Sequence, residues 1–99
     1  MIRGTTPTHI FNTQESTRTL AEIRVFYSQG DRLLFTKTED DVTLLENAIK
    51  VRLSQQETMM FSHAMPAKVQ LKVLTIDGIA KATPVKMVPV GEILSEEVF

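Results

Sequence analysis

The chain has 99 residues, of which 42% are hydrophobic and 23% charged, and these ordinary globular values exclude a disordered protein. Its formal net charge is −1, with Lys and Arg scattered along the sequence, so the composition argues against a protein that grips nucleic acid or anionic lipid. There is no cysteine, which excludes disulfides, thiolate metal sites and cysteine nucleophiles together.

The length predicts a single domain covering residues 1–99. The first seven residues lack the apolar stretch of a signal peptide, and no apolar run approaches the roughly 20 residues of a membrane span. We therefore expect a soluble protein that does not interact with a membrane, and we expect any export to occur as part of a larger particle.

Alternation of apolar and polar residues dominates the sequence and predicts about seven strands. The segment of residues 21–27 is a good example, because Ile23, Val25 and Tyr27 alternate with more polar neighbours. Turn-forming residues at 28–31 and 46–47 separate neighbouring strands. The predicted strands are residues 8–11, 21–27, 32–37, 42–45, 49–53, 68–73 and the segment that follows Gly78.

A short helix is predicted between the fifth and sixth strands. Ser54 and Glu57 have the spacing of a capping box, in which each side chain binds the backbone N–H of the other residue. Residues 58–61 supply an apolar side, and Pro66 prevents the helix from extending much beyond His63. A helix of about two turns is marginal alone, so it must dock on the sheets.

Asp77 and Gly78 predict a tight hairpin with a two-residue turn, in which both positions have positive φ. Pairing outward from that turn places Val73 opposite Ala82. Beyond Pro84 the apolar positions change phase, and proline cannot donate a hydrogen bond to a sheet, so we expect a bulge or an edge position there.

These elements predict an all-β fold, a small antiparallel β-sandwich of immunoglobulin-like type with one short helix between the fifth and sixth strands. A partly open barrel remains an alternative, because the order of the strands in space cannot be read from one sequence.

No catalytic constellation is present, so we predict a protein that is not an enzyme and that uses no cofactor or metal. His9 and His63 are far apart and lack carboxylate partners at the spacing of metal ligands, and no serine lies in a nucleophile elbow. The acidic run at residues 39–41 has two interpretations, a calcium site and a solvated turn. The second is favoured because the spacing of a dedicated calcium loop is missing.

Taken along nearly its full length, the chain resembles a family of small uncharacterised proteins encoded by phages and prophages of Gram-positive, Firmicutes-type bacteria. The resemblance rests on residues 1–9, 23–29, 53–58 and 69–78, and its most specific part is the opening Met-Ile-Arg-Gly-Thr-Thr-Pro-Thr-His. The chain departs from the family pattern at residues 13–19 and at Met59 and Met60. The resemblance implies a place among structural, tail-proximal phage proteins, made in the bacterial cytoplasm and then incorporated into the virion, and it supplies no activity and no functional residues.

We therefore expect a non-enzymatic phage structural or tail-associated module that acts through protein–protein contacts, either with other phage structural proteins or with itself as a homo-oligomer. The candidate surfaces are an opening arm, a methionine-rich patch, a strand edge after Pro84 and an amphipathic tail at residues 91–99. Their candidate contact residues are Ile2, Met59, Met60, Phe61, Val85, Met87, Val90, Leu94 and Phe99.

Two other classes of function are weighed against this one. A small β-sandwich that binds a carbohydrate or a host factor is the main alternative, although the absence of Trp and the single, inward-facing Tyr27 speak against sugars. A nucleic-acid binder would need a basic face assembled by folding. The residues available for it are Arg24, Lys50, Arg52, Lys68 and Lys72.

Overall fold

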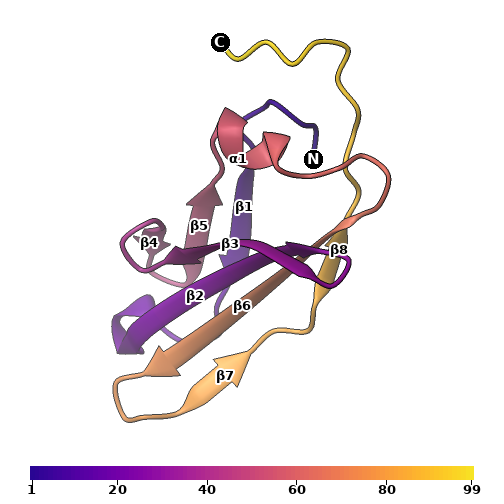
Figure 1. Cartoon of the computed structure of the whole chain (residues 1–99). Helices are drawn as coiled ribbons and strands as arrows, with labels where there is room; N and C mark the ends of the chain where they lie inside the picture. The colour runs from indigo at the N-terminus through magenta and orange to yellow at the C-terminus, as the bar shows by residue number, and fades with distance from the viewer.

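The computed structural model describes residues 1–99 and consists almost entirely of strands (Figure 1). The elements are β1 (Thr8–Asn12), the 3-10 helix η1 (Thr17–Thr19), β2 (Leu20–Gln29), β3 (Arg32–Thr38), β4 (Thr43–Leu45), β5 (Ala48–Arg52), α1 (Gln55–Met59), β6 (Ala67–Thr75), β7 (Ala80–Ala82) and β8 (Lys86–Val88). The helices are short, and none has the length or the apolar character that crossing a bilayer requires.

The strands form two sheets, and the predicted small antiparallel β-sandwich is confirmed. One sheet has three strands in the order β1-β5-β4. The other has five strands, with the order β3-β2-β6-β7 and with β8 also paired to β6. Every pair of neighbouring strands is antiparallel.

The strand order differs from that of an immunoglobulin domain. In that fold the second strand lies in the same sheet as the first, fourth and fifth. Here β2 lies in the other sheet, between β3 and β6. The cause is the connection at residues 13–19, which carries the chain across to the second sheet. There Ser16 caps η1, and the buried Thr17 donates its hydroxyl to the Leu45 carbonyl at 2.6 Å.

The core lies between the sheets and is built from the alternating residues of the central strands. Ile23, Val25 and Tyr27 of β2 are buried, as the alternation predicted. They pack against inward residues of β5 and β6 and against the chain around α1. These partners are Ile49, Val51, Leu53, Phe61, Ala67, Val69 and Leu71.

The predicted capping box is confirmed at the start of α1. The Ser54 hydroxyl accepts from the Glu57 N–H at 3.1 Å, and the Glu57 carboxylate accepts from the Ser54 N–H at 2.8 Å. The helix is shorter than the two turns predicted, because the Gln29 side chain forms hydrogen bonds with the backbone of the residues after the helix. This side chain accepts from the Ser62 N–H and donates to the carbonyls of Ser62 and Met65, which draws the chain away from a helical path.

The final hairpin exists, but its predicted register is wrong by one residue. Val73 pairs with Lys81 rather than with Ala82, so the loop contains three residues, 76–78, instead of two. Only Gly78 has positive φ, at +87°, while Thr75 binds both Asp77 and the Ile79 N–H and closes the loop. Three-residue hairpin loops commonly end on such a left-handed residue.

The bulge predicted near Pro84 is confirmed. Lys72 pairs with Ala82 in β7, and Val69 pairs with Lys86 in β8. Three steps along β6 therefore correspond to four steps along the opposite chain. The extra residue falls around Pro84, where a missing N–H interrupts the ladder.

Candidate functional site

Most of the residues predicted to form contact surfaces are exposed. Ile2, Met60, Val85 and Met87 are each about half exposed, at 49–52%. Leu94 and Phe99 are completely exposed, at 106% and 101%. Met59 and Val90 are only half-buried, and Val90 packs against the core.

Phe61 does not belong to a surface, and its assignment to one is wrong. It is 1% exposed. Its ring lies edge-on to Tyr27 at 6.4 Å between centroids and to Phe35 at 5.8 Å. Edge-to-face contacts of this kind stabilise buried aromatic clusters, and Phe61 closes the core below α1. Of the methionine-rich patch, Met60 is the most exposed member and Met59 is half-buried.

The C-terminal tail, residues 91–99, follows the opening arm of the chain and passes α1 at one end of the molecule (Figure 1). Gly91 is anchored to the arm by hydrogen bonds between its N–H and the Met1 carbonyl at 2.6 Å, and between its carbonyl and the Arg3 N–H at 3.2 Å. Farther on, the Gln55 side chain binds the N–H and the carbonyl of Phe99 at 2.8 and 3.3 Å. The predicted amphipathic turn does not form, because polar contacts hold the tail as irregular backbone.

The polar contacts leave two apolar side chains of the tail, Leu94 and Phe99, in solvent, whereas Ile93 is half-buried beside Gly4. Glu96 lies 3.7 Å from the Arg3 guanidinium, so one of the three carboxylates of the tail contacts the arm. Leu94 and Phe99 make no such contact and project fully into water. The tail thus presents two large apolar side chains on a backbone that is already held in place.

Charge is unevenly divided between the tail and the rest of the chain. Residues 91–99 contain Glu92, Glu96 and Glu97 and no basic side chain. Residues 1–90 hold all eleven Lys and Arg and the other nine acidic residues, which is an excess of two positive charges. The near-neutral total therefore conceals an acidic tail on a mildly basic body.

A groove opens between the two sheets, at the end where β1 finishes and β6 and β7 meet. Its volume is about 340 Å³. Leu20, Leu71, Val73 and Ala82 are its apolar lining, and residues 12–15 form one wall. The groove exists because the three-stranded sheet leaves the inner side of β7 and the adjoining part of β6 uncovered.

Lys81 lies at the mouth of this groove and was not recognised as a candidate from the sequence. A two-residue hairpin turn would have placed Lys81 on the outer face of the sheet. The three-residue loop instead pairs Lys81 with Val73 and so brings it to the inner face, where it lines the groove. Its ammonium lies 3.4 Å from Glu15, and both side chains remain more than half exposed.

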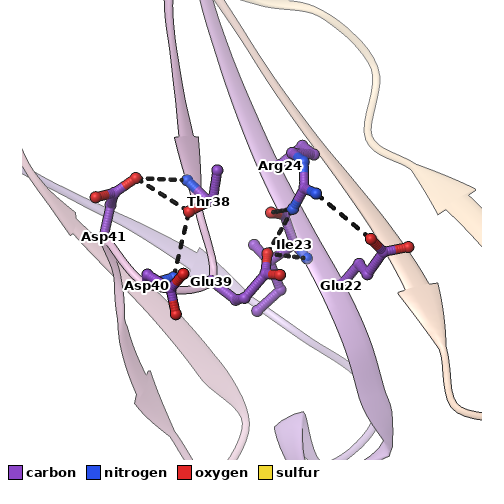
Figure 2. A network of polar contacts seen from close by, with 7 residues as sticks. All are labelled: Glu22, Ile23, Arg24, Thr38, Glu39, Asp40 and Asp41. Atoms are coloured by element: carbon purple, nitrogen blue, oxygen red, sulfur yellow. Dashed lines mark hydrogen bonds and ion pairs between the residues drawn. The ribbon is translucent and has the colours of Figure 1, made fainter.

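The acidic run at residues 39–41 is a turn in which two of the three carboxylates, those of Glu39 and Asp41, bind donors of the protein itself (Figure 2). The Glu39 carboxylate accepts from the Ile23 N–H and from the Arg24 guanidinium. The pKa of Glu39 is held below its usual value, first by hydrogen bonding to its own backbone N–H and to that of Ile23, and then by Arg24. Asp41 turns the other way and accepts from the N–H and hydroxyl of Thr38. The three carboxylates do not converge on one point, and no group of three or more His, Asp or Glu side chains in the structure does so.

His9 has a structural partner. Its Nδ1 atom lies 2.8 Å from the Tyr27 hydroxyl, and the two rings are stacked. Burial lowers the pKa of His9 and raises that of Tyr27, so both rings are neutral at neutral pH. His63 is exposed in the loop after α1, far along the chain from His9.

The basic residues considered for nucleic-acid binding do not share one face. Arg24 pairs with Lys72 across β2 and β6, whereas Lys50 and Arg52 belong to β5 in the other sheet. Arg24 is also neutralised by ion pairs with Glu22 and Glu39 (Figure 2). The basic residues that the sequence offered for nucleic-acid binding therefore lie on two different sheets and do not form one basic face.

Comparison with protein-family models, with curated proteins and with solved structures gives no match for this chain. The site must therefore be interpreted from its own geometry, which consists of an apolar, acidic tail and an apolar groove with a lysine at its mouth.

Proposed function

We propose that this protein is a non-enzymatic assembly module of a phage particle and that it acts through protein–protein contacts. The observation that supports this most is the tail, on which Leu94 and Phe99 are held fully exposed. The resemblance to tail-proximal phage proteins supports the same reading, with synthesis in the bacterial cytoplasm and later incorporation into the virion.

The energetics favour a partner for the tail. Transferring a large apolar side chain from water into a protein interior gains about 1.5–3 kcal/mol. Leu94 and Phe99 realise none of this gain in the isolated chain, since both are fully exposed. Their backbone is already held by Gln55 and Gly91, so a partner would order little additional chain on binding.

The shape of the whole chain supports the same conclusion. Its accessible surface is 6313 Å², whereas a compact monomer of 11.2 kDa is expected to expose roughly 5,700 Å². Only 13 of the 99 residues are buried. An excess of exposed, partly apolar surface is typical of proteins that function in contact with others.

Incorporation into particles tests this function. Particles are purified from a bacterial host that carries the phage, and the amount of this chain in them is measured by mass spectrometry. We expect the Leu94→Ser/Phe99→Ser variant to be incorporated at least tenfold less than the wild type, because two buried side chains are worth more than about 1.4 kcal/mol.

Ile76→Ser is the matched control, since Ile76 is 72% exposed in the loop between β6 and β7 and does not belong to the tail. It should be incorporated like the wild type. A wild-type chain missing from the particles, or a double variant that is incorporated normally, would contradict the proposal.

A further inference from the structure

We propose that the tail of one copy docks in the groove between the sheets of a second copy, so that the protein assembles with itself head to tail. This inference rests on the assembly function proposed above and adds a partner, a donor segment and an acceptor site.

The placement of the two features requires separate copies. The tail runs past α1 at one end of the molecule, whereas residues 12–15, β7 and the end of β6 lie at the other end (Figure 1). The molecule is elongated, with extents of 47 × 28 × 18 Å. Because Gly91 anchors the tail to the opening arm, a tail that fills a groove must enter that of a neighbouring copy.

The groove matches the tail in size and polarity. A volume of about 340 Å³ is at the small end of the range for binding pockets, which suits one or two side chains better than a large ligand. Its lining of Leu20, Leu71 and Val73 would receive an apolar group such as Leu94 or Phe99. The exposed apolar side chains and the open apolar groove thus belong to the same contact.

The charge of Lys81 and the free edge of β7 would orient the incoming tail in the groove. Lys81 at the mouth of the groove lies 3.4 Å from Glu15 of its own chain but stays more than half exposed. Glu97 of an incoming tail, and Glu96 once it leaves Arg3, would therefore share its ammonium with Glu15, and the body of the acceptor copy is mildly basic. β7 is also an edge strand of its sheet, with β6 as its single neighbour. The irregular backbone of an incoming tail can therefore pair along β7 while its side chains enter the groove.

Solution mass tests the contact directly. By light scattering at low salt we expect the mass of the wild type to rise with concentration, and the Leu94→Ser/Phe99→Ser variant to associate at least tenfold more weakly. Lys81→Glu should weaken association to a similar degree. Lys72→Glu makes the same charge change on the opposite face of the sheet, opposite Arg24, and should behave like the wild type.

Two further measurements identify the geometry. The Leu94→Ser/Phe99→Ser variant keeps an intact groove and Lys81→Glu keeps an intact tail, so an equal mixture should form a dimer that does not grow further. Combining Lys81→Glu with Glu96→Lys and Glu97→Lys in one chain should restore association, since the charges at the contact are exchanged. All five substituted positions in the tail and the groove mouth are exposed, so loss of folding does not explain a loss of association.

A wild type that stays monomeric at all concentrations would overturn the head-to-tail contact, and so would a mixture of the two variants that forms no dimer. If incorporation into particles still depends on Leu94 and Phe99 in that case, the assembly function stands and the tail binds a different protein. If incorporation is also independent of them, both proposals fail.

Discussion

Glu57 shows how one side chain connects the helix to a sheet. Its carboxylate caps α1 through the Ser54 N–H and forms an ion pair with Lys37 of β3 at 2.5 Å. The two side chains are 25% and 14% exposed, so the pair is largely shielded from water. Burial alone would raise the pKa of Glu57, but Lys37 and the Ser54 N–H outweigh it and hold the pKa below its ordinary value.

The pKa of Glu57 predicts a pH-dependent contribution to stability. A carboxyl whose pKa is lowered by folding stabilises the protein above its ordinary pKa, and that contribution is lost as the pH falls through the folded-state value. Glu57→Gln should therefore lower the free energy of unfolding at pH 7 by about 1.5–3 kcal/mol, the range for hydrogen bonds to charged groups.

Urea unfolding at neutral and acidic pH provides the measurement. The difference between the wild type and Glu57→Gln should shrink once the pH is well below the ordinary carboxyl pKa of about 4.3. Glu46→Gln, in an exposed turn, is the control and should have little effect at either pH. A Glu57→Gln deficit that persists unchanged in acid would show that the ion pair is not its cause.

At the scale of elements, the loop between β6 and β7 determines which face Lys81 occupies. With three residues in the loop, Lys81 pairs with Val73 and reaches the groove. This arrangement depends on Gly78, whose φ of +87° is unfavourable for residues with a side chain. A methyl group added at Gly78 would meet no atom within 4 Å, so a substitution there acts through the backbone alone.

Gly78→Ala should therefore destabilise the protein by about 1–2 kcal/mol through its left-handed backbone, without a steric clash. Gly78→Asn should cost less, because asparagine tolerates this conformation better. Denaturant midpoints of the three proteins check the order wild type, Asn, Ala. Equal losses of stability in the Ala and Asn variants would mean that the positive φ of residue 78 does not cause the destabilisation.

The same loop shows where prediction from sequence succeeds and where it ends. Alternation predicts the buried face of β2, the spacing of Ser54 and Glu57 predicts the helix start, and Pro84 predicts the bulge, because each depends on local chemistry. The Thr75 side chain favours the three-residue loop by binding Asp77 and the Ile79 N–H. The additional loop residue shifts the register of every residue pair between β6 and β7.

The candidate site was only partly predictable for related reasons. Leu94 and Phe99 were contact candidates from the sequence and are exposed, although the amphipathic turn predicted to present them does not form. Phe61 was misplaced because its burial depends on contacts with Tyr27 and Phe35, which are distant in sequence. The groove depends on strand order, since it requires β2 to lie beside β6 and not beside β5.

At the scale of the whole molecule, folding and association share residues. Leu71 and Val73 line the groove, and both belong to or pack against a core of ten buried hydrophobic residues. A tail that docks there binds the folded state alone. Association through the proposed head-to-tail contact would therefore add to the stability of a thin molecule with few buried residues.

Thermal unfolding should in consequence depend on protein concentration. Above the dissociation constant, each tenfold rise in concentration adds up to about 1.4 kcal/mol of stability, which is roughly 6–11 °C for a domain of this size. Calorimetry at several concentrations measures the midpoint. The midpoint of the wild type should rise with concentration, and that of the Leu94→Ser/Phe99→Ser variant should not. A wild-type midpoint that stays constant would contradict the coupling of association to folding.

The elongated shape of each copy would determine the length of a head-to-tail assembly. In a head-to-tail series every copy advances the assembly by the same step, and that step is shorter than the 47 Å long dimension because each tail overlaps its neighbour. The step is a property of the rigid sandwich and does not depend on how many copies have joined. The length of such an assembly would therefore be proportional to the number of copies in it.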